Sequence, residues 1–478
     1  MANRTSVKKN FIYNLLYNIL NILVPLVTAP YTARVLGADK IGIYSRTYAV
    51  ISMVIMIGAL GSATYGQKEI ASARDDIRLR SNLFNEIALI KGLFTILVTL
   101  VFLLGSWGSS DFQYYLIQIP FLIAAIVDIS WFFQGIEKFK YIAIRNMCVR
   151  IAGVILLLLL VKSPGDLWKY LLIIGGSQLL GNLSMWPYLR GNIVKTNIRL
   201  QSIPMHIRGL IVYFIPSISY QIYAVLDKVM LGWIVGSDYE NGYYEQANKI
   251  VNMAISVVTA YTVVMRSRMS FLYAAGNKQE IQDNLRKSAN IIALLVFPMS
   301  FGLFALAKGV VPWFFGEGYD RVTEILYVFS PIFICMGYSH MMGTHILTPS
   351  GQQGKSNVGQ CAAAGVNVVL NACLIPFLNS MGAAIASVLS ELTIVFIYYW
   401  MVRKELSLKM LLSAAYKKII AAGIMFLVLW NLTKSFSVSM VSSFLEVLIG
   451  IVVYGFVLVV LQDKFAKEMI HKVLNREK

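Results

Sequence analysis

The sequence predicts an all-α, polytopic membrane protein, and this prediction rests on its composition and on its recurring uncharged stretches. The chain has 478 residues, of which 57% are hydrophobic and only 14% are charged, with a mean hydropathy of +0.66. Soluble domains carry about 25% charged residues. Uncharged stretches of roughly 20 residues, the length needed to cross a bilayer, recur along the whole chain. This composition excludes a soluble enzyme.

Charge-free runs and the residues that interrupt them predict about 14 transmembrane helices. The spans lie near residues 11–31, 42–65, 86–105, 113–134, 142–161, 169–189, 209–235, 247–265, 288–307, 325–347, 358–378, 382–402, 414–433 and 441–462. The first apolar stretch is longer than the apolar core of a signal peptide, so we expect it to remain as a helix. Residues 356–390 form one uncharged run, which we divide at 376–382 because Pro and Gly signal a turn.

Lys and Arg are unevenly distributed over the predicted loops. If the N-terminus is cytoplasmic, the cytoplasmic segments hold 30 of the 42 Lys and Arg residues and the outer loops hold 8. Because an excess of Lys and Arg is typical of cytoplasmic loops, this bias predicts that both termini are cytoplasmic. It also accounts for the net charge of +18 without nucleic acid as a partner, since no basic and aromatic surface module is evident.

The loops are too short to hold a folded soluble domain, so any function must be built between helices. A membrane glycosyltransferase or polymerase would more typically carry a long loop with catalytic groups, and we therefore expect a protein that is not an enzyme. The four cysteines are Cys148, Cys335, Cys361 and Cys373. They lack CxxC spacing, so neither a disulfide framework nor a metal site is expected.

A short motif recurs after the first span of each half of the chain. Residues 36–44 read LGADKIGIY and residues 235–244 read VGSDYENGYY, and prolines precede both copies, at Pro25 and Pro30 and at Pro216. Six spans separate the copies, so both enter the membrane the same way round, which predicts a parallel repeat. We expect a six-helix bundle over 1–200, a second over 201–403, and two additional transmembrane helices with a basic cytoplasmic tail over 404–478.

Four segments, taken together and in order, resemble a known family. They are residues 33–37 with 42–44, residues 128–138 (DISWFFQGIEK), residues 227–232 running to Gly242, and residues 367–371 with 374–376 and 382–386. Over nearly its whole length the chain resembles the polysaccharide and oligosaccharide repeat-unit flippases of the multidrug/oligosaccharidyl-lipid/polysaccharide exporter superfamily. The segment 131–135 looks more like the polysaccharide branch than the drug-exporting branch.

The resemblance implies a flippase of the bacterial plasma membrane that works by alternating access and performs no covalent chemistry. Its substrate would be a polyprenyl-pyrophosphate-linked oligosaccharide of a capsule, O-antigen or exopolysaccharide pathway, moved from the cytoplasmic to the outer leaflet. Its other partners would be the lipid bilayer and a polysaccharide polymerase or assembly protein. A lipid II flippase and a cation-coupled drug exporter of the same superfamily are the alternatives, and a membrane glycosyltransferase or polymerase is a more distant one.

Such a substrate requires a cationic cavity, because a pyrophosphate cannot cross hydrocarbon as a bare anion. Arginine offers two parallel hydrogen bonds to phosphate, and lysine offers a compact charge. A charge within a span costs at least about 2.5–3.5 kcal/mol, so it usually faces a cavity or a partner. The basic candidates are Arg150, Lys228, Arg46, Lys91, Arg34 and Arg145. Arg150 lies deepest in its span among the arginines. Arg34, Arg46 and Arg145 lie near the membrane–water interfaces, where a basic side chain can serve as an anchor without any role in a cavity.

Three acidic residues within spans, Glu391, Asp227 and Asp128, are candidates for ion coupling. A buried carboxylate can bind H+ or Na+ and couple the gradient of that ion to a conformational change. The alternative is an internal ion pair, which the neighbouring Asp227 and Lys228 invite, although adjacent helix residues point about 100° apart. We expect no cofactor beyond such a coupling ion.

Two further polar patterns have less specific interpretations. His340 and His345 are five residues apart and do not share a helix face well, so a metal site is not expected there. Asn14, Asn18 and Asn21 form one polar stripe on the first span. That stripe fits either hydrogen bonding to neighbouring helices or lining of the sugar path.

Overall fold

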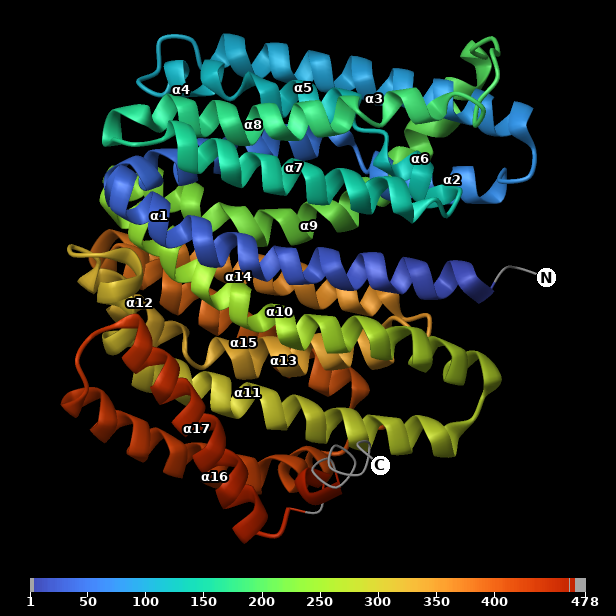
Figure 1. Cartoon of the computed structure of the whole chain (residues 1–478). Coiled ribbons are helices and arrows are strands. Elements are labelled where there is room, and N and C mark those ends of the chain that lie inside the picture. Colours follow the sequence, from blue (N-terminus) through green and yellow to red (C-terminus); the bar gives the residue numbers. More distant parts are fainter. Residues whose placement is uncertain (1–3, 464, 469–478) are drawn as a thin grey trace. The chain divides into compact units, whose positions relative to one another are not determined.

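The protein is described by a computed structural model that covers residues 4–463 and 465–468, with side chains given outside residues 4–22, 139, 200 and 215–224. Helices make up 86% of the structure, and the described residues form no strand (Figure 1). The prediction of an all-α fold is confirmed. The asparagine stripe at residues 14, 18 and 21 lies outside the described side chains.

The described chain divides into two compact units, of which the first comprises residues 1–232 and 237–242. Its helices are α1 (Arg4–Ala59), α2 (Ser62–Ser72), α3 (Ile77–Gly105), α4 (Phe112–Ile117), α5 (Ile119–Val127), α6 (Ser130–Gly135), α7 (Phe139–Leu160), α8 (Leu167–Leu183) and most of α9 (Ile203–Val235). The first residues of α10 also belong to this unit. An extended connector, residues 190–199, joins α8 to the short 3-10 turn before α9.

The second unit comprises residues 233–236 and 243–478. Its helices are α10 (Asp238–Ala275), α11 (Lys278–Phe315), α12 (Asp320–Phe329), α13 (Ile332–Met342), α14 (Gln353–Leu378), α15 (Ser380–Val402), α16 (Leu408–Ser435) and α17 (Met440–Val460). A five-residue π-helical segment, Gly343–Leu347, continues α13. Within this unit α16 and α17 lie side by side (Figure 1). The predicted limits at residues 200 and 403 stay predictions.

Ten helices are long and apolar enough to cross a membrane, or 11 if the bent pair α12 and α13 is counted as one span, among the residues searched. This result confirms a multi-pass membrane protein. The count is lower than our prediction partly because α1 continues through the first two predicted spans, and because α8 has only 17 residues. The break inside the uncharged run 356–390 lies at Asn379, within the predicted interval. The number of about 14 spans and the parallel repeat of two six-helix bundles stay predictions.

Both copies of the sequence motif contain a glycine in the left-handed region of the backbone. Gly37 interrupts α1 with φ of 82°, and Gly236 separates α9 from α10 with φ of 66°. A side chain is disfavoured at such angles, which explains why glycine follows the helix in each copy. Gly42 also permits close approach, because a Cβ there would lie 1.6 Å from the Asp238 carbonyl oxygen. Residues 38–42 of the first copy and 238–242 of the second copy therefore lie against each other within the first unit.

The aromatic segment 131–133 forms much of the core near α2 and α3. Trp131, Phe132 and Phe133 are buried to 2% exposure or less. Gly66 of α2 makes room for the indole, since a Cβ there would lie 2.4 Å from Trp131 Cε3. This packing fixes α6 and, with it, the break at residues 128–129 between α5 and α6. Residues 131–133, which belong to a segment that resembles the flippase family, therefore form part of the hydrophobic core of the first unit.

Candidate functional site

A cavity of about 500 Å³ lies inside the first unit, where helices α7 and α8 face α1. Helices α7 and α8 lie side by side (Figure 1). The polar residues that line the cavity are Thr28, Asp128, Arg145, Asn146, Arg150, Tyr170, Ser177, Gln178 and Asn182. Three of the predicted site residues, Arg150, Arg145 and Asp128, therefore lie around one cavity.

The walls of this cavity follow from helical periodicity. On α7 the lining residues Arg145, Val149, Gly153 and Leu157 are four apart, and on α8 the lining residues Tyr170, Ile174, Gln178 and Asn182 are four apart. Residues at this spacing lie on one helix face. Small residues bring the two faces together, since a Cβ on Gly181 would lie 2.5 Å from Val149 Cγ2. Arg145 lies near the start of α7 and Leu157 lies near its end. The charged end of the cavity is therefore near the start of this helix, and the apolar end is near Leu157.

Arg145 is held at the charged end by several neutral acceptors. Its Nε donates to Asn146 Oδ1 at 2.9 Å, and its Nη1 donates to Asn182 Oδ1 at 2.8 Å and to Ser130 Oγ at 3.1 Å. The amide of Asn182 is itself fixed, because its Nδ2 donates to the Ala124 carbonyl oxygen at 2.7 Å. The guanidinium is therefore positioned before any ligand arrives. Arg150 follows five residues later on α7 and also lines the cavity, half-buried.

Lys91 and Asp128 meet at the break between α5 and α6. Lys91 is only 4% exposed, and its Nζ donates to the Asp128 carbonyl oxygen at 2.6 Å. The Asp128 carboxylate accepts from the backbone N–H of Ser130 at 2.9 Å and also from the Ser130 hydroxyl. Lys91 is absent from the cavity lining. In this structure it stabilises the break in the helix rather than presenting its charge to the cavity.

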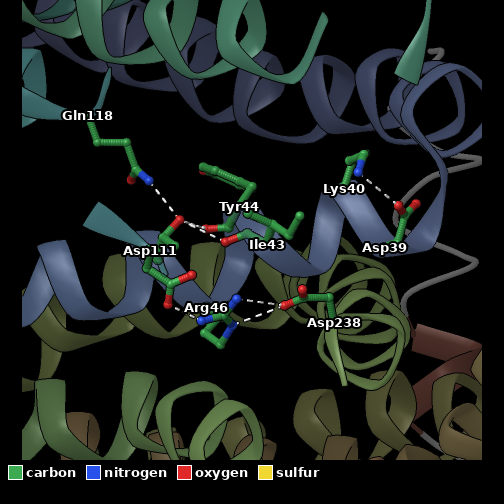
Figure 2. Close-up of polar contacts among 9 residues, drawn as sticks. Asp39, Lys40, Ile43, Tyr44, Arg46, Asp111, Gln118 and Asp238 are labelled. Carbon is green, nitrogen blue, oxygen red and sulfur yellow. Dashed lines mark hydrogen bonds and ion pairs between the residues drawn. The ribbon is translucent and has the colours of Figure 1, made fainter. Parts of the chain in front are cut away.

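Arg46 belongs to a different part of the first unit, where it lies between two carboxylates (Figure 2). Its Nε donates to Asp238 Oδ1 at 3.0 Å, and its Nη1 forms an ion pair with Asp111. The side chain is 18% exposed. Gln118 of the same region donates to Thr47 Oγ1 at 2.7 Å. Arg46 is not among the residues that line the cavity.

The remaining candidates are separate from the cavity lining. Arg34 is exposed on α1, and Asp227 and Lys228 lie on α9, where Asp227 is 5% exposed and Lys228 is half-buried. Glu391 lies on α15 in the second unit at 4% exposure, and its Oε2 accepts from Ser339 Oγ at 3.3 Å. His345 is fully buried in the π-helical segment. In the described part of the chain, no three His, Cys, Asp or Glu side chains form a group that could hold a metal ion.

The amides of the cavity are not among the residues predicted from the sequence. Asn146, Gln178 and Asn182 are neutral, so they carry none of the charge signal on which the candidates were chosen. A search for polar residues four apart on the sixth predicted span would have found Gln178 and Asn182. Such a pair of amides does not by itself predict a cavity, because amides within spans also form hydrogen bonds between neighbouring helices.

A polar, arginine-lined cavity inside a helical membrane-spanning unit is a kind of site that transporters use. The chain belongs to the family described as polysaccharide biosynthesis protein, whose model matches residues 7–266. The resemblance seen in the sequence and the expectation of a transporter that is not an enzyme are both confirmed.

Similar proteins are named as transporters or flippases. A protein of Escherichia coli (strain K12) named as an O-antigen transporter is 24% identical over 84% of this chain and 98% of its own length. One of Shigella dysenteriae with the same name is 23% identical over 81% of this chain and 98% of its own length. A low-salt glycan biosynthesis flippase of Haloferax volcanii is 23% identical over 37% of each chain.

Solved structures share the fold. The lipid II flippase MurJ in an inward closed conformation aligns with a TM-score of 0.67 and 16% identity, covering 96% of this chain and 99% of MurJ. A multidrug resistance MATE family transporter in an inward-facing conformation aligns with a TM-score of 0.58 and 12% identity, covering 88% of this chain and 99% of its own. At these identities the comparison speaks for the fold alone.

Proposed function

We propose that this protein is a flippase for polyprenyl-pyrophosphate-linked oligosaccharide repeat units of a capsule, O-antigen or exopolysaccharide pathway. The observation that carries the proposal is the α7–α8 cavity, in which Arg145 and Arg150 lie together with amide and hydroxyl groups. The protein moves the lipid-linked oligosaccharide from the cytoplasmic to the outer leaflet of the bacterial plasma membrane by alternating access. Both chain termini lie in the cytoplasm, as the loop charges predict.

The charged end of the cavity suits a diphosphate. Charge-assisted hydrogen bonds from arginine to phosphate oxygens are short and about twice as strong as neutral ones. Arg145 is already oriented by Asn182 and Ser130, so little side-chain entropy is lost when an anion binds. Arg150, about 7.5 Å farther along the helix axis, supplies the second cation.

The rest of the lining suits the two other parts of this substrate. Gln178, Asn146 and Ser177 offer hydrogen-bond donors and acceptors for sugar hydroxyls. Leu157, Ile174 and Val154 form an apolar surface next to the polar one, which suits the first isoprenoid units of the carrier lipid. A hydrophilic drug or a free sugar would leave this apolar surface unused.

Transport requires energy, and we propose that Glu391 binds the coupling ion, H+ or Na+. This carboxyl is nearly fully buried on α15 and contacts the hydroxyl of Ser339. Asp227 and Asp128 are the further ion-coupling candidates, and Asp128 differs from Glu391 because it lines the cavity. No resident cofactor takes part in this scheme. A membrane polysaccharide polymerase or assembly protein is the expected protein partner.

Two alternatives within the superfamily have their own support. A lipid II flippase would have the same diphosphate and isoprenoid chemistry, and MurJ shares the fold. A cation-coupled drug exporter shares the fold as well, but a cavity lined by two arginines disfavours a cationic drug. A membrane glycosyltransferase or polymerase has no support from the similar proteins.

The direct test is translocation in proteoliposomes of a labelled polyprenyl-pyrophosphate oligosaccharide, scored by an impermeant sugar-modifying enzyme. We expect protein-dependent flipping that Arg150→Ala strongly reduces and that the control Lys140→Gln preserves. Lys140 is exposed near the start of the same helix and is absent from the lining. Flipping of lipid II with no flipping of other oligosaccharides would support the first alternative. Efflux of a cationic dye without any flipping would support the drug exporter.

A further inference from the structure

A second buried polar group lies in the first unit, apart from the cavity. It consists of Tyr65 on α2, Glu86 on α3 and His206 on α9, which are 5%, 3% and 0% exposed. None of the three lines the cavity. Buried ionisable groups are costly and need a structural or functional reason. We refer to these three residues as the Tyr-His-Glu group.

The three side chains form a continuous hydrogen-bonded chain. The Tyr65 hydroxyl lies 2.8 Å from His206 Nδ1, and His206 Nε2 lies 2.9 Å from Glu86 Oε2. The other carboxylate oxygen, Glu86 Oε1, accepts from the backbone N–H of Arg199 at 3.0 Å. Both ring nitrogens and both carboxylate oxygens therefore have partners.

These contacts fit two protonation states that differ by one proton. With a neutral imidazole, Tyr65 donates to Nδ1 and Nε2–H donates to the Glu86 carboxylate, and the group carries one negative charge. With an imidazolium, Nδ1–H donates to the Tyr65 oxygen, Nε2–H still donates to Glu86, and the group is neutral overall. Uptake of one proton thus removes the net charge from a buried site. Imidazole is the side chain whose ordinary titration falls near neutral pH.

Other charged or titratable residues lie near the group on α2, on α9 and on the connector. Glu69 and Tyr213 lie near Tyr65, and Lys68 lies over the Tyr213 ring at 5.6 Å from its centroid. Arg199 contributes its backbone N–H to Glu86, while its side chain is exposed. Arg208, two residues beyond His206, is also exposed. Among the side chains that the structure describes, Glu86 is the charged group in direct contact with the imidazole.

The close packing around the group leaves little room for a ligand larger than a proton. A Cβ on Gly209 would lie 2.3 Å from Tyr65 Cε2. A Cβ on Gly61, at the start of α2, would lie 2.6 Å from the Phe214 backbone nitrogen and 2.9 Å from the Leu210 carbonyl oxygen. Helix α9 is thus pressed against α2 at this point, and a metal ion with its own ligands would not fit without rearrangement.

The group is also the last of a series of contacts that hold the connector and the 3-10 turn after it, together the 190–202 connector, on α3. Earlier in the series, Arg80 donates to the Asn192 carbonyl oxygen at 2.7 Å, the Val194 N–H donates to Ser81 Oγ at 2.9 Å, and Asn85 donates to Thr196 Oγ1 at 3.1 Å. Glu86 ends the series by holding both Arg199 and His206. A change at His206 therefore acts on the connector and on the first turns of α9 together.

We propose that the Tyr-His-Glu group is a proton-binding site whose occupancy sets how firmly the 190–202 connector and the start of α9 are held on α2 and α3. The bound proton turns a hydrogen bond from a neutral imidazole to the Glu86 carboxylate into an ion pair between opposite charges, which is stronger. Acidification tightens the connector and alkalinisation loosens it. This site is independent of the α7–α8 cavity and of the identity of the transported lipid.

Proton binding is measured directly by ¹⁵N solid-state NMR of histidine-labelled protein in liposomes, because the chain has only four histidines. We expect an imidazole signal that is missing in His206→Gln to convert to imidazolium between pH 8 and pH 5. If His206→Gln does not fold, His340→Gln, His345→Gln and His471→Gln identify the signal by elimination. In Glu86→Gln the imidazolium to imidazole ratio of His206 at pH 6 should fall about tenfold.

The effect on the connector is measured by hydrogen–deuterium exchange at pH 6 and pH 8, corrected for intrinsic exchange. We expect the Arg199 amide to be at least threefold better protected at pH 6 in the parent protein. The control His345→Gln keeps this difference, since His345 lies in the second unit, whereas His206→Gln loses it. A His206 signal that stays neutral from pH 8 to pH 5, or protection that does not change with pH, would overturn the proposal.

Discussion

Arg46 and Arg145 lie in the same unit and near the ends of predicted spans, yet their side chains meet different kinds of partner. Arg46 lies between the carboxylates of Asp111 and Asp238, whereas Arg145 is held by the amides of Asn146 and Asn182. Arg46 thus lies in direct ion pairs, whereas the contacts of Arg145 with Asn146, Asn182 and Ser130 are hydrogen bonds to neutral groups that orient the guanidinium. The comparison teaches that two intramembrane arginines at similar predicted depth can have different kinds of partner, which depth along the chain does not reveal.

The largest expected effect is on transport and concerns the cavity arginines. Arg150→Ala removes a cation that would donate to the diphosphate, and hydrogen bonds to charged groups contribute about 1.5–3 kcal/mol. We therefore expect flipping to fall by about tenfold to a hundredfold while membrane insertion and thermal stability are retained. The assay is translocation in proteoliposomes beside Lys140→Gln, whose rate should match the parent protein.

Lys228→Ala sharpens this comparison, because Lys228 lies on α9 outside the cavity lining. A loss as large as that of Arg150→Ala would extend the cationic surface to α9. Unchanged transport in both variants would remove the assignment of the cavity as the diphosphate site.

The next effect is on stability and concerns Arg46. Arg46→Gln leaves Asp111 and Asp238 close together without their cation, and breaking a largely buried pair costs about 2–3 kcal/mol at this partial exposure. Thermal unfolding in nanodiscs should show a clear drop in Tm. The control is Lys40→Gln on the same helix, whose pair with Asp39 is about one-third exposed, and that change should cost less than about 1 kcal/mol. Equal losses in the two variants would contradict the contrast drawn between Arg46 and Arg145.

A smaller effect is expected when the cavity is filled without changing its charge. Gly153 lines the cavity, and a Cβ there would lie 3.5 Å from Ser177 Oγ, an ordinary contact. Gly153→Leu should therefore fold and reduce flipping about tenfold, since the lipid headgroup loses space. Gly176→Leu is the matched control on α8, where an added Cβ meets nothing within 4 Å and the residue is absent from the lining. Normal flipping by Gly153→Leu would place the substrate elsewhere.

The smallest effect concerns an ion pair at the end of a span, whose carboxylate, Asp166, lies outside it. Lys169 holds the pKa of Asp166 below its ordinary value, with help from the backbone N–H groups of Lys162 and Ser163. A lowered pKa in the folded state stabilises the protein above the unfolded-state value of about 3.9, and this contribution is lost as the pH falls through the folded-state value. Asp166→Asn should lower Tm by only about 1–2 °C at pH 7, and the difference should shrink below pH 4. A drop as large as that of Arg46→Gln would remove the distinction between loop and intramembrane pairs.

Individual residues show how far sequence reasoning reached into the site. Arg145, Arg150 and Asp128 were all found by their charge within apolar spans, and the structure places them around one cavity. Lys91 was found by the same rule, but it stabilises the break before Ser130 through the Asp128 carbonyl group. Asn182 and His206 were missed, because an amide or a single histidine in a span has no distinctive pattern until its partners are known.

The sequence by itself determined the helical membrane fold, the family and the set of intramembrane charges, because hydropathy and charge cost depend on residue type and on distance along the chain. Only the tertiary structure decided which charges share a cavity, which are neutralised by carboxylates, and which amides orient them. Those outcomes depend on contacts between helices far apart in sequence, such as Arg46 with Asp238 and Glu86 with His206. Such contacts are set by side-chain packing and by the requirement that buried polar groups find partners, which no local pattern encodes.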